Sequence, residues 1–338
     1  MVQAIPNAAP APEPAPAAPC VEAPRLPVPR WTERLFLLVG LGLLGYVVSR
    51  YPAADIGRAC LRLGPLVALT PLLALAWFGF NTTALYLLLD RRVPWRHLLR
   101  VRLIGDGYNA LLPLAGFGGE PFKVKHLSPF VPVDEVLTAL IRDRVLENAV
   151  GMLFTSVWLA VAVGTIVMAA SFRAALVTYA ALASAVGIAI VLLVLTRLPA
   201  RVGGRLARWL GAGTQEAVAL PPSRLTRVLC CYLAARVTGT LEPAVLLWLL
   251  GLGVDPVTTL FCYSLHHAAG TVSFAIPAGL GVFEGTSVYL FSVLGFPGAS
   301  GVAFALARRG RMLLMGLLGV ALHLGQLRAR GRSTGPRS

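Results

Sequence analysis

The sequence predicts an all-α polytopic membrane protein, with about six to eight transmembrane helices and two Gly/Pro-broken re-entrant segments. Three observations support this fold class. Hydrophobic residues make up 57% of the 338 residues and charged residues only 13%, whereas about a quarter of an ordinary globular domain is charged. Apolar stretches recur at the length of about 20 residues that a spanning helix needs. Two further apolar stretches contain Gly and Pro and cannot form unbroken helices.

Six apolar stretches are expected to span the bilayer. They are residues 33–49, 64–89, 145–170, 173–196, 226–250 and 301–327. Residues 1–30 are a Pro- and Ala-rich tract that is expected to be disordered and does not read as a cleaved signal. The chain is therefore divided into this tail, an integral membrane domain over residues 31–328 and a basic tail over residues 329–338.

The arginines are concentrated between the predicted spans, and the formal net charge is +15. Three basic stretches, residues 91–102, 197–208 and 328–337, follow the second, fourth and last spans. By the positive-inside rule these stretches and the C-terminus are cytoplasmic, which predicts a multi-pass protein of the cytoplasmic (inner) membrane. We attribute the charge to orientation and to contact with anionic membrane lipids, and expect no nucleic-acid partner.

The two broken stretches cover residues 105–120 and 270–284. Non-helical backbone at membrane depth is expected only where protein or water satisfies its polar groups, so both stretches are predicted to be re-entrant hairpins. They align without gaps at an offset of 164 residues, which pairs Pro113 with Pro277. This alignment predicts an internal repeat. The repeat is inverted if the second stretch returns to the side that it entered from, and parallel or accidental if it crosses.

Several ionisable residues are predicted to lie at membrane depth, where each costs about 2.5 kcal/mol or more and usually pairs or functions. The offset also pairs Glu120 with Glu284 and Arg144 with Arg308. We expect these four to line a site for an anionic head group, because an arginine fork binds phosphate through two hydrogen bonds. Glu284 is expected to be the counter-charge of Arg308 and of its neighbours Arg309 and Arg311, and it is expected to neutralise them when the site is empty.

Other charged residues have plainer interpretations. Arg142 and Asp143 are expected to form structural ion pairs or to lie at the cytoplasmic interface. Glu242 stands alone in the fifth predicted span. Lys123, with the nearby Lys125 and His126, either contacts phosphate or is an ordinary positive-inside residue, and the sequence does not separate these alternatives.

The sequence predicts no metal and no cofactor. Adjacent His266 and His267 point about 100 degrees apart on a helix, and no Cys, Asp or Glu with ligand spacing joins them. His266 is either a proton carrier lining a cavity or a hydrogen-bonded histidine of the bundle. Asp106 and Glu120 are further candidate proton carriers.

The two broken stretches and the charged residues that follow them resemble a known family. The motifs are Asn109-Ala-Leu-Leu-Pro113-Leu-Ala-Gly116-Phe-Gly118-Gly119-Glu120, then Arg144, then Pro277-Ala-Gly279-Leu-Gly281-Val-Phe-Glu284, and Arg308. Over about residues 33–327 the chain resembles the flippase-like membrane domain of lysylphosphatidylglycerol synthases. That family also includes free-standing relatives such as hopanoid-biosynthesis-associated membrane proteins.

The resemblance implies translocation of a lipid or lipid-linked anionic compound. In full-length synthases a soluble domain transfers the aminoacyl group and the membrane domain moves the product. This chain ends at Ser338, soon after its last span, so we expect a transporter and no aminoacyl transfer. The candidate substrate-binding and translocation residues are Asn109, Pro113, Gly118, Gly119, Glu120, Arg144, Pro277, Gly281, Glu284 and Arg308.

Two alternative functions stay open at this point. One is a membrane enzyme acting on lipid phosphates, with Glu120, Asp143 and His266 as acid and base. The other is a non-catalytic membrane partner of a lipid-biosynthesis complex, which would work beside an enzyme of that pathway.

Overall fold

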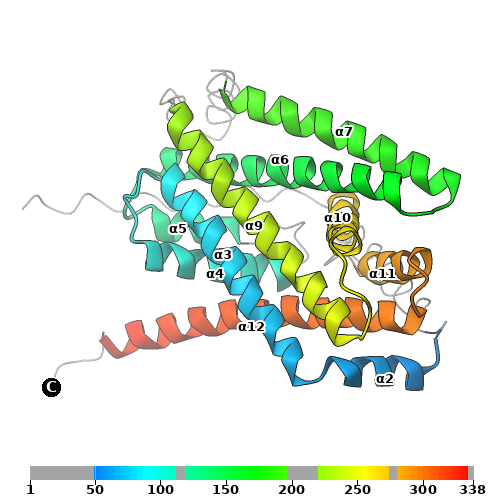
Figure 1. Cartoon of the computed structure of the whole chain (residues 1–338). Helices are drawn as coiled ribbons and strands as arrows, with labels where there is room; N and C mark the ends of the chain where they lie inside the picture. The colour runs from blue at the N-terminus through cyan, green and yellow to red at the C-terminus, as the bar shows by residue number, and fades with distance from the viewer. Residues whose placement is uncertain (1–48, 50, 112–118, 196–219, 274–279, 334–338) are drawn as a thin grey trace, which may run out of the picture.

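A computed structural model of the chain describes residues 49, 51–111, 119–195, 220–273 and 280–333. In these parts every regular element is helical and no strand is present (Figure 1). The helices are α2 (Ala53–Leu63), the 3-10 helix η1 (Pro65–Ala68), α3 (Leu69–Leu88), α4 (Trp95–Leu111), α5 (Glu120–Leu127), α6 (Val133–Thr165), α7 (Ala170–Leu195), α9 (Pro222–Leu249), α10 (Pro256–Val272), α11 (Val282–Val293) and α12 (Gly298–Ser333). The N-terminal tail and nearly all of the predicted first span lie outside the described residues.

Four segments in the described part of the chain are long and apolar enough to cross a membrane. They are Pro65–Leu88, Val133–Thr165, Ala170–Val194 and Pro222–Leu249. They correspond to four of the predicted spans, and the predicted span 301–327 lies within the continuous helix α12. The prediction was wrong about the start of α6, which begins well before residue 145. The charged residues that were placed at the entrance of this span are instead inside the helix, where they meet neighbouring helices.

Two helix pairs, α4–α5 and α10–α11, form the hairpins, and each returns to the end of the bundle where it began. At the start of α4, His97 Nε2 lies 3.2 Å from the carbonyl oxygen of His126, near the end of α5. Around the second hairpin, Leu252 just before α10 and Leu294 just after α11 contact the same hydrophobic cluster. Both broken stretches are therefore re-entrant, as predicted.

The two hairpins enter from opposite ends of the bundle. Val136, near the start of α6, belongs to the hydrophobic cluster that holds the base of the first hairpin. Leu159, near the end of α6, belongs to the cluster that holds the base of the second. Since α6 is long enough to span a membrane, the two bases lie on opposite sides of its span.

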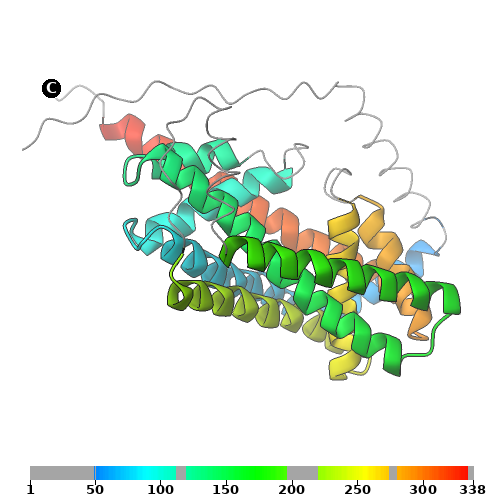
Figure 2. The same ribbon diagram turned by 90° about the horizontal axis from the view of Figure 1, so that it is seen from above.

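The helix order α3-α4-α5-α6 recurs as α9-α10-α11-α12. Corresponding helices run in opposite directions, as Figure 1 shows for α3 against α9 and for α6 against α12. This arrangement is an inverted repeat, the architecture of many transporters whose halves meet near the membrane midplane. Helix α7 is outside the repeat and packs along α6 on one flank of the bundle (Figure 2).

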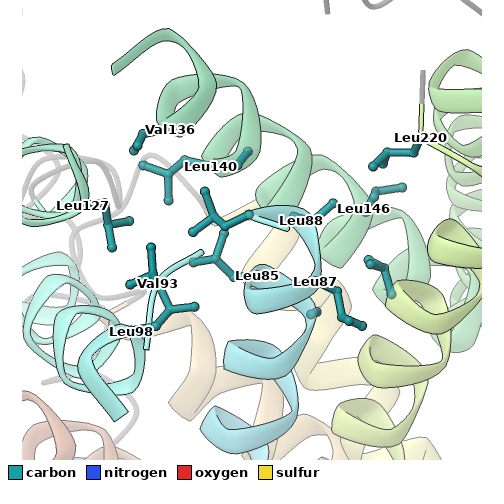
Figure 3. Close-up of a cluster of buried hydrophobic side chains, with 14 of the residues drawn as sticks. Leu85, Leu87, Leu88, Val93, Leu98, Leu127, Val136, Leu140, Leu146 and Leu220 are labelled. Atoms are coloured by element: carbon teal, nitrogen blue, oxygen red, sulfur yellow. The ribbon is translucent and has the colours of Figure 1, made fainter. Parts of the chain in front are cut away.

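The base of the first hairpin is held by leucine and valine side chains from several helices (Figure 3). Leu85 of α3, Leu127 of α5 and Leu146 of α6 are at most 1% exposed. The outer faces are also apolar, since Leu182 of α7 and Leu317 of α12 are 63% and 59% exposed. Apolar side chains facing outward suit a helix bundle whose surroundings are lipid tails.

Candidate functional site

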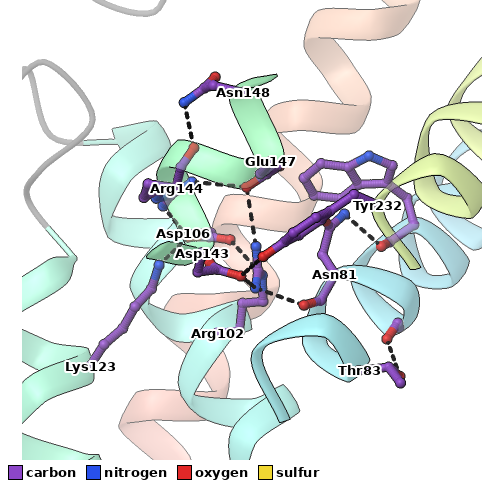
Figure 4. Close-up of polar contacts among 12 residues, drawn as sticks. Asn81, Thr83, Arg102, Asp106, Lys123, Asp143, Arg144, Glu147, Asn148 and Tyr232 are labelled. Atoms are coloured by element: carbon purple, nitrogen blue, oxygen red, sulfur yellow. Dashed lines mark hydrogen bonds and ion pairs between the residues drawn. The ribbon is translucent and has the colours of Figure 1, made fainter. Parts of the chain in front are cut away.

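A group of charged side chains from α4, α5, α6 and α9 lies beside the first hairpin, and most of it is drawn in Figure 4. We call this group the first charge cluster; its members are Arg102, Asp106, Glu120, Lys123, Asp143, Arg144, Glu147 and Arg236. Four members are cations and four are carboxylates. The cluster therefore compensates its own charge, as a buried group of ions must.

Arg102 of α4 lies at the centre of the first charge cluster and is 1% exposed. Its Nη1 donates to Asp143 Oδ1 at 3.1 Å and to the Asn81 carbonyl oxygen at 3.0 Å. Its Nη2 donates to Glu147 Oε2 at 3.3 Å. The prediction that Arg102 belongs to a basic cytoplasmic loop was wrong, because α4 begins at Trp95 and carries Arg102 about two turns into the helix, where it contacts α6.

Asp106 and Glu120 are joined by two shared cations. Lys123 Nζ lies 2.6 Å from Asp106 Oδ1 and 3.0 Å from Glu120 Oε1. Arg144 Nη2 lies 2.9 Å and 3.0 Å from the same two oxygens. Arg102 Nε, at 3.6 Å, is a third cation beside Asp106. Proton transfer through Asp106 would thus require cations to move away from it.

The first charge cluster has a buried side and an accessible edge. The side chains of Arg102 and Lys123 are 1% and 2% exposed, so Lys123 is a buried ion-pair residue in this structure. The side chains of Arg144 and Glu120 are 35% and 20% exposed. Among the described members of the cluster, Arg144 and Glu120 are the most exposed, so this edge, where the half-buried guanidinium meets the hairpin carboxylates, is the one that a ligand could reach.

The helices of the first hairpin approach each other through glycine. A Cβ atom added to Gly119 would lie 1.8 Å from the carbonyl oxygen of Gly105, so a side chain at residue 119 would collide with α4. Asn109 Oδ1 accepts a hydrogen bond from Gly119 N at 2.6 Å. Asn109 and Gly119 thus close the hairpin directly before Glu120 and fix where its carboxylate lies.

Asp143 is a buried ion-pair residue and not an interfacial one. It is 1% exposed, and it accepts hydrogen bonds from Arg102 and, at 2.7 Å, from the Tyr232 hydroxyl of α9. Arg236, four residues further along α9, donates from Nη2 to the Glu147 carbonyl oxygen at 2.8 Å. Tyr232 and Arg236 had no distinguishing signal in the sequence beyond their position in an apolar span.

A second group of charges lies beside the second hairpin. We call Glu242, Glu284, Arg308, Arg309 and Arg311 the second charge cluster. Glu284 is fully buried, and it accepts from Arg309 Nε at 2.6 Å and from Gly281 N at 2.8 Å. Gly281 therefore serves as the cap of α11, and its φ of +76° is a conformation that favours glycine.

Of the three arginines for which Glu284 was the expected counter-charge, Glu284 contacts Arg309. Arg308 Nη2 lies 3.5 Å from Glu242 Oε2, and Arg311 Nε lies 2.9 Å from Glu242 Oε1. Glu242 is therefore not alone but holds two arginines of α12. A helix turns 100 degrees per residue, so adjacent arginines face different neighbours.

His266 is a buried, hydrogen-bonded histidine. Its Nε2 lies 2.7 Å from Ser287 Oγ, and its Nδ1 lies 2.8 Å from the Cys262 carbonyl oxygen. The neighbouring His267 turns to α6, where its Nδ1 lies 3.0 Å from Thr155 Oγ1. The two histidines thus point to different helices. Among the residues that the structure describes, no three His, Cys, Asp or Glu side chains are grouped to hold a metal ion.

Three of the predicted site residues, Pro113, Gly118 and Pro277, lie outside the described residues. The structure divides the other candidates between two places. Asn109, Gly119, Glu120, Arg144 and Asp106 lie at the first charge cluster, while Gly281, Glu284, Arg308 and His266 lie at or beside the second.

Comparison with known families matches residues 35–319 to the lysylphosphatidylglycerol synthase TM region. No curated protein and no solved structure matches the chain. The family match covers most of the chain and includes both hairpins and both charge clusters. The chain therefore belongs to the family of the lysylphosphatidylglycerol synthase transmembrane region.

Proposed function

We propose that this protein moves a lipid or lipid-linked anionic compound across the cytoplasmic membrane, as a transporter and not as an enzyme. The proposal rests on Arg144. Its side chain is 35% exposed, and it contacts two carboxylates of the first re-entrant hairpin. An exposed cation at such a place is costly unless it pairs or works.

A head-group phosphate can take over the contacts that Asp106 and Glu120 make with Arg144. Phosphate accepts two parallel hydrogen bonds from a guanidinium, as a carboxylate does. Lys123 lies beside the same two carboxylates and Arg102 lies 3.6 Å from Asp106, so both carboxylates keep a cation when Arg144 turns to the ligand. The site is thus neutral when empty, and exchanging one anion for another opens it without leaving a buried charge unpaired.

The inverted repeat supplies the second requirement, access from both sides. The hairpins enter from opposite ends of the bundle, and each has arginines beside it. A head group that leaves the first charge cluster would therefore meet Arg308, Arg309 and Arg311 of the second, while the acyl tails stay in lipid. The end that carries Arg92, Arg96 and Arg224, with the C-terminus, is placed in the cytoplasm in this proposal.

The test is transfer of fluorescent anionic phospholipids between leaflets of liposomes that contain the purified protein. The wild type is expected to accelerate transfer, and Arg144→Gln to slow it about tenfold or more, as expected when one charge-assisted phosphate contact is lost. Arg58→Gln is the matched control, because Arg58 is an exposed arginine of α2 outside both clusters.

No acceleration for any lipid class, with protein shown to be folded, would contradict the proposal. A protein that moves no lipid but co-purifies with a lipid-synthesis enzyme would indicate a partner role. Product formation that disappears with Glu120→Gln would indicate an enzyme.

A further inference from the structure

Helix α9 is fastened to both halves of the repeat, each time by a different part of its length. In its first part, Tyr232 donates to Asp143 and Arg236 donates to the Glu147 carbonyl oxygen, both on α6. In its second part, Glu242 holds Arg308 and Arg311 of α12. Relative movement of α6 and α12 must therefore bend α9 or break one set of contacts.

From just before the Glu242 attachment to the residue after it, α9 carries three features that weaken a helix. Pro243 lies inside the helix and has no N–H, so the Gly239 carbonyl oxygen has no helical donor four residues on. Thr240 Oγ1 donates back to the Val237 carbonyl oxygen at 2.6 Å, a contact that often bends helices. Gly239 adds backbone freedom at the same turn.

This turn of α9 packs closely against α10. A Cβ atom on Gly239 would lie 2.9 Å from the ring of Tyr263, so the glycine lets this α10 side chain lie against the α9 backbone. Arg236 Nη1 lies 3.5 Å from the hydroxyl of the same tyrosine. At the repeat offset Pro243 aligns with Gly79 of α3, where an added Cβ would meet nothing within 4 Å. Both helices that open a repeat thus have a residue of low helix propensity at the matched place, Gly79 in α3 and Pro243 in α9.

We infer that α9 couples the two charge clusters, with Arg236 and Glu242 as positioning residues and the turn from Gly239 to Pro243 as the joint at which the halves rock. This inference rests on the proposed function and adds the conformational change that would accompany transport. Binding at one cluster would then be transmitted to the other through the bend of α9, because Arg236, before the joint, is held by α6 and Glu242, within the joint, is held by α12.

Pro243→Ala restores the missing helical hydrogen bond and stiffens the joint. The variant is expected to translocate lipid about tenfold more slowly, because product-releasing motions set many turnover rates, while its melting temperature stays equal or rises. Pro222→Ala is the matched control: Pro222 is in the first turn of α9, where no hydrogen bond is gained, and no change is expected.

Distances between spin labels at Ile141 of α6 and Leu317 of α12, two exposed positions, provide a readout that does not depend on transport. The wild type is expected to show a broad or double distribution that narrows in Pro243→Ala. The same narrow distance distribution in both proteins would overturn the inference that α9 bends at this joint. A Pro243→Ala variant that is slow but has a lowered melting temperature would overturn it as well. If the wild type moves no lipid but the distribution narrows as expected, the proposed function fails and the joint stands.

Discussion

The two hairpins occupy equivalent places in the repeat and are held in different ways. At the repeat offset, Arg102 and Lys123 of the first hairpin correspond to His266 and Ser287 of the second. The first two are cations that each contact more than one carboxylate. The second two are neutral and contact each other at 2.7 Å. One backbone architecture therefore holds two cations at these positions of the first hairpin and a histidine–serine pair at the matched positions of the second.

This difference has a consequence for mobility. The first hairpin is tied to α6 by several ion pairs, whereas among the described residues the second hairpin is tied to α12 through the pair of Glu284 with Arg309. Buried ion pairs are costly to break singly but add little net stability over apolar packing. In the proposed mechanism, the first charge cluster is therefore where charge exchange with a ligand would occur, and the second hairpin is the half that would move more readily.

The largest expected change in stability distinguishes Arg102 of the first hairpin from His266 at the matched position of the second. Arg102→Ala leaves Asp143 and Glu147 without their central cation and should lower the free energy of unfolding by about 3–5 kcal/mol. His266→Ala, at the corresponding position, loses only neutral hydrogen bonds and should cost about 1–3 kcal/mol. Unfolding by SDS in mixed micelles measures both values. Equal losses at the two positions would show that the two hairpins do not differ in this respect.

A second effect compares the two repeat-related glutamates. Glu284→Gln removes the buried partner of Arg309 and should cost about 2–3 kcal/mol, the range for hydrogen bonds to charged groups. Glu120→Gln should cost less, about 1 kcal/mol, because Glu120 is partly exposed and Asp106 still compensates Lys123 and Arg144. The same denaturation series measures both, and a larger loss for Glu120→Gln would reverse our assignment of the accessible edge.

A third effect compares how the hairpins are closed. Gly119→Ala drives a methyl group into the α4 backbone and should cost about 1–3 kcal/mol, the usual range for overpacking. Gly281→Ala instead strains a residue at positive φ and should cost about 1–2 kcal/mol. Melting temperatures in detergent measure the two losses. Gly119→Ala should also expose the hairpin to added protease, and resistance equal to the wild type would contradict the close contact.

The smallest expected effect is a gain in stability, whereas the substitutions above are expected to lower it. A Cβ atom at Gly310 of α12 would meet nothing within 4 Å. Gly310→Ala should therefore stabilise the protein by about 0.5–1 kcal/mol through helix propensity alone. A loss of stability would show that α12 needs the glycine for a contact or a bend beside the second charge cluster.

Much of the fold could be predicted from local features of the chain. Apolar length located the spans, and Gly and Pro located the two hairpins, since these residues interrupt a helix wherever it lies. The proximity of Glu120 and Arg144 could also be predicted, because this pair joins a hairpin to the next helix along the chain. The start of α6 could not be predicted in this way, because charged residues inside a helix resemble a loop until their partners on other helices are known.

The sequence by itself determined that this is a helical membrane protein with two broken segments that align at an offset of 164 residues, because hydropathy and backbone breakers act locally. Only the tertiary structure decided which charges meet. Arg102 finds Asp143, and Glu242 finds Arg311, across stretches of chain that carry no pairing signal. Charge pairing depends on which helix faces lie within about 4 Å of each other, a distance that packing sets.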